Sequence, residues 1–435
     1  MSLKSSIRKI IPSSALLRYH QLSASIASSW YGNPSRQLVV IGVTGTKGKS
    51  TTCNYIWSVL QSSGKKTALT GTANFRLGTV ETLNPYHLSM PGAWVIQKFL
   101  RRAVTEGCTH AVIEVTSEGL KQWRHTGIQF DVATFTNLTP EHLPSHNNSF
   151  DEYRAAKLRL FEALKSSSKS APCAVLNNDS PEVAAFAAAS PQRRVTYSTG
   201  APADLAAADI QVTATGGTFR INTTPFTLQI PGFFNVSNAV AAVAVGRALG
   251  LSLEQCAPGI AALAGVPGRM EKIDMQQSFS LWVDYAHEKE SMGGLLETLR
   301  AMRTSADQRI IILLGAEGGG RDKTKRPIMG EQVGRLADYV VVSNVDPYED
   351  DPTPICEDIA RAAEATGKVR DQNLFVIEDR RSGIAKALSL AQPGDLVAIT
   401  GKGAEQSIVI GGKSSPWDDR TVVREELTKL LRATQ

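Results

Sequence analysis

Residues 38–52 read LVVIGVTGTKGKSTT, an apolar run that passes directly into a loop rich in glycine and lysine. A stretch with helical spacing, residues 51–64, follows at once. A buried strand, a glycine-rich loop and a helix N-terminus in this order aim backbone N–H groups at phosphate oxygens. The pattern therefore predicts a phosphate-binding loop made of Gly45, Thr46, Lys47, Gly48, Lys49, Ser50 and Thr51.

The loop departs from the GxxxxGK[ST] pattern at one position, because its first glycine position holds Val43 and Gly42 lies one residue too early. The alternative interpretation is a glycine-rich turn with an incidental lysine. The strand–loop–helix context favours nucleotide binding instead. In that case Lys49 contacts the β- and γ-phosphates and Ser50 ligates Mg²⁺.

Composition places this loop in a large globular chain. The 435 residues are 42% hydrophobic and 20% charged, which excludes disorder and suggests two or three domains of roughly 150 residues. The best apolar run, residues 239–251, is interrupted by Gly246 and Arg247, so we expect no membrane span. The net charge of +6 is spread along the chain, which favours anionic small-molecule substrates over nucleic acid.

The cysteines and the N-terminal residues indicate the cellular compartment in which the protein is expected. The five cysteines are far apart and never form a CxxC pair, so we expect reduced thiols in a cytoplasm, with no zinc site and no disulfide. Residues 1–36 carry positive charge but lack an unbroken apolar segment with a clear cleavage site. They predict a short helical segment and not a signal peptide.

From Gln37 onward, strand patterns alternate with helix-length stretches. Such alternation predicts a mainly parallel sheet with helices on both faces. The buried-strand candidates are residues 66–71, 110–115, 132–137 and 173–178. Residues 209–230 alternate with period two around a Gly-Gly pair, which predicts a small antiparallel hairpin region on the same sheet.

A second α/β series follows the stretch AGVPG at residues 264–268, the best linker candidate. Its strand candidates are residues 281–286, 309–316, 339–344, 374–379 and 396–401. We therefore predict an α/β protein in three parts. A helical segment spans 1–36, a P-loop central domain spans 37–267, and a Rossmann-like α/β C-terminal domain spans 268–435.

Potential metal ligands follow the predicted central strands. Glu114 ends one strand, His142 follows the next, and Lys157 lies in a helical stretch further on. Because the carboxyl ends of parallel strands meet at one edge of a sheet, Glu114 and His142 are expected beside the phosphate loop. Taken singly, Glu114 could be a structural carboxylate and Lys157 a solvated helix charge.

Several ordered motifs together resemble the Mur ligases, most closely the MurE type. They run from Gln37 to Arg424 and include GTKGKS, IEVTSEGL, FDVATFTNLTPEHL, YRAAKLRLF, PGFFNVSNAVAAVAVGRALG, GVPGRMEKID, VDYAH, GGGRDKTKRP, SNVDPYEDDP and GKGAEQ. The resemblance implies an ATP-dependent amide ligase that adds an amino acid to a carboxylate-bearing peptidoglycan precursor. The reaction would pass through an acyl phosphate and give ADP and phosphate.

The resemblance also implies catalytic and metal-binding roles. Lys49 would hold the phosphates, Ser50 and Glu114 would bind one Mg²⁺, and His142 would belong to a second Mg²⁺ site. Lys157 matches the family's carbamylated lysine. Uptake of CO₂ by a neutral amine turns a cation beside a metal into an anionic oxygen ligand.

For the nucleotide, the resemblance implies that Asn137 lies near the γ-phosphate, Asn238 contacts adenine, Arg269 reaches the phosphates and Asp284 binds ribose. Without it, Asn238 could be a helix-surface or capping amide and Arg269 a surface cation. Arg269 and Asp284 follow the linker. ATP would therefore bind between two domains that close on a hinge.

For the incoming amino acid, Arg321 matches an arginine that binds its carboxylate with two parallel hydrogen bonds. Diaminopimelate-adding members read DNPR where this chain has residues 345–348, VDPY, so diaminopimelate is disfavoured. Asp346 and Glu405 would suit a cationic side chain such as lysine, or could be solvated loop acids. The predicted amino-acid site comprises Arg321, Asp346, Tyr348, Gly401 and Glu405.

Three alternatives remain beside a MurE-like enzyme. Only about 36 residues precede the first strand, where the MurE type has a uridine-binding domain, so a folylpolyglutamate-synthetase-like or other ligase on a non-UDP acceptor competes. A non-catalytic nucleotide-binding partner subunit would not need His142 and Lys157. A nucleic-acid ATPase would show basic clusters and stacking aromatics. We expect small-molecule substrates, a monomer and a cytoplasmic location.

Overall fold

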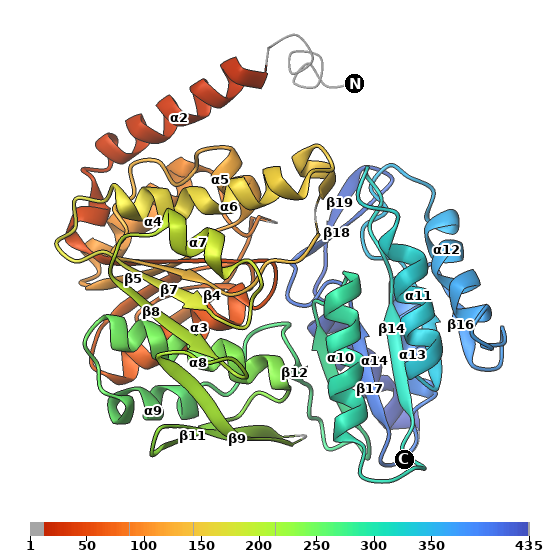
Figure 1. Ribbon diagram of the computed structural model, residues 1–435. Coiled ribbons are helices and arrows are strands. Elements are labelled where there is room, and N and C mark those ends of the chain that lie inside the picture. The colour runs from red at the N-terminus through yellow and green to blue at the C-terminus, as the bar shows by residue number, and fades with distance from the viewer. Residues whose placement is uncertain (1–12, 87, 142, 214, 434–435) are drawn as a thin grey trace.

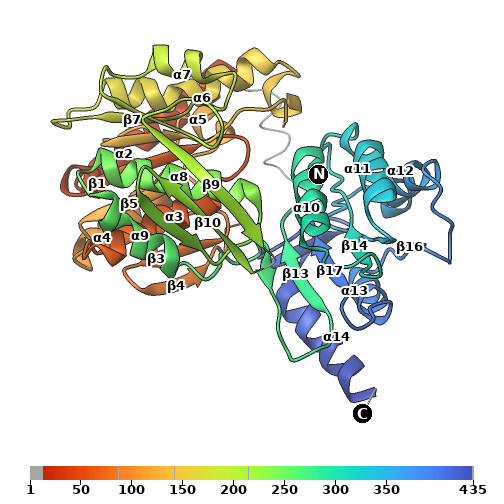
Figure 2. The same ribbon diagram turned by 60° about the horizontal axis from the view of Figure 1, so that its bottom comes forward.

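The structure is a computed structural model that describes residues 13–433 apart from 87, 142 and 214. Two lobes lie side by side, each built on its own sheet (Figures 1 and 2). We call residues 34–262 the central lobe and residues 271–433 the C-terminal lobe. No helix within the described residues is long and apolar enough to cross a membrane.

The large sheet of the central lobe has eleven strands among the described residues, in the order β11-β10-β9-β8-β7-β6-β1-β5-β2-β3-β4. Strands β2, β5, β1, β6, β7, β8 and β9 run parallel, which confirms the predicted mainly parallel sheet. The strands are β1 (Val39–Thr44), β2 (Thr67–Thr70), β3 (Asn74–Leu77), β4 (Val80–Leu83), β5 (His110–Glu114), β6 (Val132–Phe135), β7 (Cys173–Asn177), β8 (Arg194–Ser198), β9 (Leu205–Thr213), β10 (Gly216–Ile221) and β11 (Thr224–Leu228).

Both edges of this sheet are antiparallel. The predicted hairpin region is confirmed by β9, β10 and β11. At the other edge, β3 and β4 form a hairpin that the sequence analysis did not predict. Each of these two strands has only four residues and shows little hydrophobic alternation, so the usual strand signal is weak.

Helices cover both faces of the large sheet, because successive side chains on its parallel strands point to opposite faces and both sides are apolar. Val40 and Ile41 belong to different hydrophobic clusters for this reason. On one face lie α3 (Lys49–Ser62), α8 (Phe233–Ala248) and α9 (Leu253–Ala262). On the other lie α4 (Ala93–Thr105), α5 (Ser117–Lys121), α6 (Phe150–Lys165) and α7 (Val183–Ala189).

A further helix, α2 (Ser13–Trp30), precedes the central lobe and packs on α4. Ala24 and Ala27 are fully buried in this contact, and Trp94 Nε1 donates to Ser23 Oγ at 3.1 Å. The short helical turns η1 (Pro34–Gln37) and η2 (Leu143–His146) complete this part. The described portion of the predicted N-terminal segment is thus helical, and residues 1–12 lie outside the described residues.

The sheet of the C-terminal lobe has the order β12-β13-β17-β14-β15-β16, and all pairs except β12–β13 are parallel. This arrangement confirms the predicted Rossmann-like lobe. Its strands are β12 (Glu271–Lys272), β13 (Ser280–Asp284), β14 (Ile310–Leu314), β15 (Tyr339–Val342), β16 (Leu374–Val376) and β17 (Leu396–Thr400).

Helices α10 (Lys289–Met302), α11 (Lys325–Leu336) and α12 (Pro352–Glu364) cover one face of this second sheet. Helices α13 (Arg380–Ser389) and α14 (Asp419–Ala433) cover the other. A separate hairpin, β18 (Ser407–Ile410) and β19 (Lys413–Pro416), was not predicted. It follows the GKGAEQ motif, so the motif lies in a loop between a buried strand and an exposed hairpin.

Candidate active site

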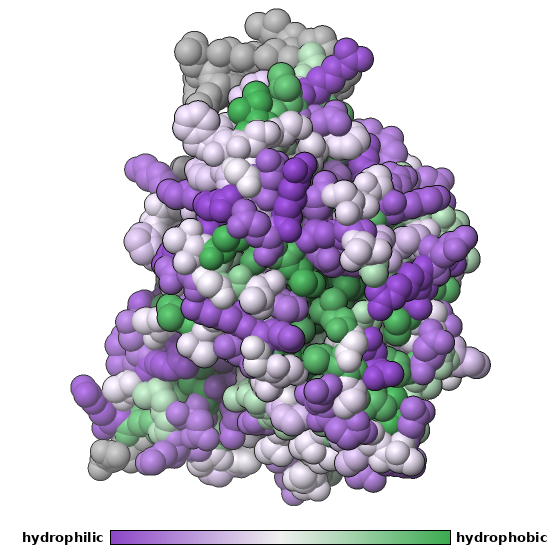
Figure 3. Space-filling model, turned by 90° about the vertical axis from the view of Figure 1, so that its left-hand side faces the viewer, coloured by the Kyte–Doolittle hydropathy of each residue, from purple (hydrophilic) through white to green (hydrophobic). Residues whose placement is uncertain are grey.

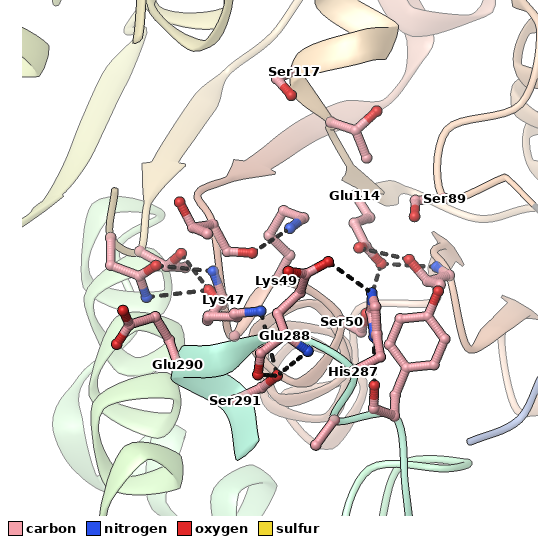
Figure 4. A pocket seen from close by; sticks show the side chains of 18 of the residues that line it. Lys47, Lys49, Ser50, Ser89, Glu114, Ser117, His287, Glu288, Glu290 and Ser291 are labelled. Atoms are coloured by element: carbon pink, nitrogen blue, oxygen red, sulfur yellow. Dashed lines mark hydrogen bonds and ion pairs between the residues drawn. The ribbon is translucent and has the colours of Figure 1, made fainter. Parts of the chain in front are cut away.

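A cavity of about 680 Å³ lies between the two lobes, at the carboxyl ends of β1, β5, β6 and β13 (Figure 4). Open α/β sheets bind ligands at such strand ends. The predicted residues that line it are Thr46, Lys47, Gly48, Lys49, Ser50, Thr51, Glu114, Asn137, Lys157, Asn238, Arg269, Asp284 and Arg321. Residues predicted from both halves of the sequence are thus brought to one site.

The phosphate loop joins β1 to α3 and is held by the end of the neighbouring strand β6. Thr46 N donates to Asn137 O at 2.9 Å, and Lys47 N donates to Asn137 Oδ1 at 2.8 Å. Gly45 and Gly48 have φ angles of 153° and 80°. A Cβ on Gly45 would lie 1.9 Å from Thr136 Oγ1, so this position requires glycine. Helix α3 then begins at Lys49 and turns its N-terminus to the cavity.

Lys157, which is buried, and Lys49, which is half-buried, share one backbone acceptor in this loop. Lys49 Nζ donates to Gly45 O at 3.1 Å and to Thr46 O at 2.9 Å. Lys157 Nζ, from α6, donates to the same Gly45 O at 2.6 Å and lies over the Tyr153 ring. Burial lowers the pKa of both amines, and the charge of Lys49 lowers the pKa of Lys157 further. Lys157 is therefore the amine that is most readily held neutral here.

Glu114 ends β5 directly beside the loop, because its register partner on β1 is Val43. Ser50 Oγ donates to Glu114 Oε2 at 2.9 Å, while Thr72 donates to the same carboxylate from its N–H at 2.8 Å and its hydroxyl at 2.7 Å. The carboxylate is therefore buried and fixed in orientation. One carboxylate and one hydroxyl beside a phosphate loop are the oxygen ligands that Mg²⁺ takes, together with phosphate and water.

The predicted second metal ligand, His142, lies outside the described residues. Among the residues that the structure does describe, no group of three or more His, Cys, Asp or Glu side chains is placed to hold an ion. Glu141, however, is buried at this position, with Oε2 at 2.7 Å from Lys47 Nζ. Its Oε1 has no hydrogen-bond partner within the described part of the chain. An unbonded buried carboxylate oxygen of this kind fits a bound cation.

The sequence analysis missed Glu141 and Tyr153, although both lie next to predicted residues. Glu141 precedes His142 in the chain, and Tyr153 lies one turn before Lys157 on α6. The Tyr153 hydroxyl lies 3.1 Å from Thr46 Oγ1 and so ties α6 to the phosphate loop. A carboxylate beside a predicted ligand, and an aromatic residue at i−4 on the same helix face, were the available signals.

The residues predicted to hold the nucleoside come together from both lobes. Asn238 is buried, accepts from Thr52 Oγ1 at 3.2 Å and donates to Asn235 Oδ1 at 3.0 Å, which excludes the helix-surface alternative. Arg269 lies over the Tyr285 ring at 4.1 Å, and its Nη2 lies 3.5 Å from Ser50 Oγ across the lobe boundary.

Asp284 ends β13, and its two carboxylate oxygens accept from the N–H groups of Met270 and Ala286, each at 2.7 Å. Burial raises the pKa of this carboxyl, and the nearby Arg269 opposes the rise. Each oxygen keeps a second lone pair, so Asp284 can still accept from a ligand hydroxyl in the cavity.

The five residues predicted for the amino acid divide into two groups. Arg321 lines the cavity. The other four lie outside the cavity lining: Asp346, Tyr348, Gly401 and Glu405. Lys402, which is fully buried, donates to Asp346 Oδ2 and Glu405 Oε2, each at 2.7 Å. Asp346 and Glu405, which were predicted to bind a cationic substrate side chain, are therefore already paired with Lys402.

A second charged cluster in the cavity was not predicted. Lys325 Nζ pairs with Glu288 Oε1 at 2.6 Å and with Glu317 Oε2 at 2.7 Å. His287 lies within 4 Å of both acids, yet burial lowers its pKa to about 3, so the imidazole is neutral. Figure 4 shows Glu288 and His287 facing the phosphate loop from the C-terminal lobe.

Comparisons with known proteins match both lobes. Residues 43–246 match the Mur ligase middle domain, and residues 268–403 match the Mur ligase, glutamate ligase domain. The chain is 39% identical to the UDP-N-acetylmuramyl-tripeptide synthetase of Roseiflexus sp. (strain RS-1) over 422 residues, which cover 94% of this chain and 82% of that protein.

Two solved structures are similar to this chain over most of its length. A UDP-N-acetylmuramoyl-L-alanyl-D-glutamate–2,6-diaminopimelate ligase superposes with a TM-score of 0.61 at 30% identity, over 90% of this chain and 79% of that one. The folylpolyglutamate synthase of Mycobacterium tuberculosis superposes with a TM-score of 0.69 at 18% identity, over 88% of this chain and 92% of that one. The second likeness shows a shared fold.

Proposed function

The chain belongs to the Mur ligase family, whose members use ATP and Mg²⁺ to form amide bonds, and we propose that it adds an amino acid to a carboxylate of a muramyl-peptide precursor. It is an ATP-dependent ligase that forms C–N bonds. The observation that carries the substrate proposal is the cavity between the lobes. It combines a phosphate loop and buried Glu114 and Lys157 from the central lobe with Arg321 from the C-terminal lobe.

The reaction would proceed in two displacements. The acceptor carboxylate oxygen attacks the γ-phosphorus of ATP, so the bond to the β-phosphate oxygen breaks and ADP leaves an acyl phosphate behind. The amine nitrogen of the amino acid then attacks the acyl carbon, loses a proton and expels phosphate. Positioning and charge neutralisation supply most of the rate in such transfers.

The phosphate loop would bind the triphosphate through its N–H groups and through Lys49. Lys47 lies beside it and reaches α10, where its Nζ is 3.4 Å from Ser291 Oγ. Ser50 and Glu114 would hold one Mg²⁺, which neutralises phosphate charge when it is bound. Asn238 and Asp284 would contact the adenosine, and Arg269 would bring a second cation to the phosphates from the other lobe.

Lys157 would act as a carbamate. Its neutral amine attacks CO₂, a C–N bond forms, and the nitrogen loses a proton, which leaves an anionic carboxylate. Two observations support this: Lys157 and Lys49 share the Gly45 carbonyl, and Lys157 is buried while Lys49 beside it is half-buried. A carbamate would replace repulsion between two amines by attraction. With Glu141 and His142 it would supply oxygen and nitrogen ligands for a second Mg²⁺.

Arg321 would bind the carboxylate of the incoming amino acid, since it lines the same cavity from the C-terminal lobe. We propose that the acceptor binds in the part of the cavity that is lined by Ser89, Ser117 and Arg124. Arg124 is anchored there by donation to Met90 O. We also propose a monomer in the cytoplasm; its five cysteines are buried and unpaired, as in a reducing compartment.

Phosphate release tests the proposal. Purified protein with ATP and Mg²⁺ is supplied with a panel of amino acids and with UDP-linked muramyl dipeptide, a muramyl dipeptide without UDP, or a folate acceptor. Release that requires both an amino acid and a muramyl acceptor is expected, with the new amide found by mass spectrometry. Release with neither substrate would indicate a simple ATPase. Turnover only with the folate acceptor and glutamate would establish the folylpolyglutamate-type alternative.

A further inference from the structure

Helix α2 presents four large apolar side chains to solvent. Tyr19, Leu22, Ile26 and Trp30 are 64%, 62%, 48% and 76% exposed. Their spacing of three, four and four residues places them on one face of the helix, and we call them the α2 stripe. The face that packs on the central lobe uses small residues instead, among them the buried Ala24, Ala27 and Ser28.

The stripe continues onto the neighbouring helix. Trp94 of α4 is partly exposed, and its ring lies 6.4 Å from that of Trp30. Figure 3 shows hydrophobic surface at the top of this face, where Figure 1 places α2. A contiguous exposed apolar patch marks an interaction site, and exposed Trp and Tyr with Leu and Ile are typical of helices that lie in a bilayer interface.

The N-terminal part of the sequence carries side-chain charge of one sign. Residues 1–80 contain no Asp or Glu, although the whole chain has 41. The first 36 residues contain Lys4, Arg8, Lys9, Arg18 and Arg36. Arg18 and Arg36 are exposed, and Arg18 adjoins Tyr19 at the edge of the stripe. Basic residues beside an amphipathic helix attract anionic lipid headgroups.

We propose that the α2 stripe docks on the surface of an anionic lipid bilayer, with α2 lying in the interface plane. A second copy of the chain is a poorer occupant, because a two-fold contact brings the same basic surface against itself. The docking is peripheral, since α2 is not long and apolar enough to span. Catalysis does not require it, because neither α2 nor Trp94 lines the cavity.

Vesicle co-sedimentation of the full chain tests this proposal. Vesicles of phosphatidylcholine with phosphatidylglycerol are expected to bind the protein, vesicles of phosphatidylcholine alone to bind it weakly, and salt to weaken the binding. The variant Tyr19→Ser/Leu22→Ser/Ile26→Ser/Trp30→Ser should lose about tenfold or more in bound fraction. The matched control is Val80→Ser/Ile328→Ser/Val369→Ser, which removes exposed apolar side chains elsewhere and should bind like the parent.

A charge variant separates the electrostatic contribution to vesicle binding from the apolar contribution. Arg8→Gln/Lys9→Gln/Arg18→Gln should lose the preference for anionic vesicles. The stripe variant should keep the parent's circular dichroism, melting temperature and phosphate release with soluble substrates, so that a failure here is distinct from a failure of the proposed ligase activity. The proposal is overturned if the parent does not bind anionic vesicles, or if the stripe variant binds as the parent does. It is also overturned if sedimentation velocity shows a dimer that the stripe variant abolishes.

Discussion

Lys157 and Lys49 place two amines on one carbonyl oxygen, and this is the residue-scale feature with the clearest chemical consequence. Lys157→Ala should lower the rate of phosphate release at least about 100-fold, because the site would lose the proposed anionic carbamate ligand. Short carboxylates such as acetate or formate should restore part of the rate. Lys165→Ala, at the exposed end of the same helix, is the control and should keep full activity.

The proposed carbamate on Lys157 can be tested directly. Protein equilibrated with ¹³C-bicarbonate should show a carbamate signal by NMR that is absent from Lys157→Ala. Full activity of that variant would refute the role of Lys157, whatever the NMR spectrum shows.

Glu114 gives a second residue-scale prediction. Glu114→Gln keeps the shape of the side chain but removes its charge, so the Mg²⁺ concentration for half-maximal activity should rise about tenfold or more. Thr72→Val, which removes one of the bonds that orient Glu114, should raise it less. A magnesium titration of phosphate release measures both. An unchanged requirement in Glu114→Gln would mean that the cation is held elsewhere.

At the residue scale, the sequence could predict those site residues whose local structure is determined by their neighbours along the chain. The phosphate loop is the main case, since strand, glycines and helix start are contiguous. Lys402 is the opposite case: its pairing with Asp346 joins residues 56 positions apart, so nothing local marked Asp346 as already neutralised. Glu288 and Glu317 were missed for the same reason, because only the fold brings them to one lysine.

At the scale of elements, the turn from β1 into α3 depends on glycine. Gly45→Ala would place a methyl group against Thr136 in an unfavourable backbone region, and should destabilise the fold by about 3 kcal/mol and abolish ATP binding. Gly64→Ala is the matched control, since Gly64 also has positive φ but open space around it. It should cost about 1 kcal/mol. Urea unfolding compares the two, and equal losses would show that the contact with Thr136 is unimportant.

Most elements were predictable because the parallel strands are continuous apolar runs between helix-length segments. The hairpins β3–β4 and β18–β19 were not, because their strands are short and partly exposed and obtain their order by pairing. The order of the strands within the sheet also could not be predicted. Sequence order does not reveal that β1 lies between β5 and β6, which is what brings Glu114 and Asn137 to the two sides of the loop.

At the scale of the whole molecule, buried histidines make folding depend on pH. Burial lowers the pKa of His110, His125 and His146 to about 4, against about 6.5 in an unfolded chain. The unfolded state then binds more protons than the folded state between these values. The free energy of unfolding should therefore be level above about pH 6.5 and fall as the pH drops towards 4.

Urea unfolding at pH 5 and pH 7 measures this dependence. His125→Gln should reduce the slope between pH 5 and pH 7 by about 1 kcal/mol per pH unit, whatever it does to stability at pH 7. Equal stability of the parent at both pH values would contradict the buried, neutral state of these rings.

The sequence indicated two α/β units, but their mutual placement follows from contacts that no periodicity encodes. Arg269 meets Ser50, and Lys47 meets Ser291, across the boundary between the lobes. These contacts depend on where each sheet ends in space. The sequence therefore predicted that both lobes contribute to one site, but it could not predict the shape of the cavity.

The linker confines any rotation between the lobes to a few bonds. A Cβ on Gly268 would lie 2.1 Å from Ala404 N, so the backbone there is wedged against the loop after β17 and must travel with the C-terminal lobe. Val266 is bridged to Arg269 and buried, whereas Gly265 has open space around it. We therefore expect any rotation between the lobes to pivot at residues 263–265, ahead of Arg269. We expect that such a rotation would carry Arg269 with the C-terminal lobe, toward or away from the phosphate loop.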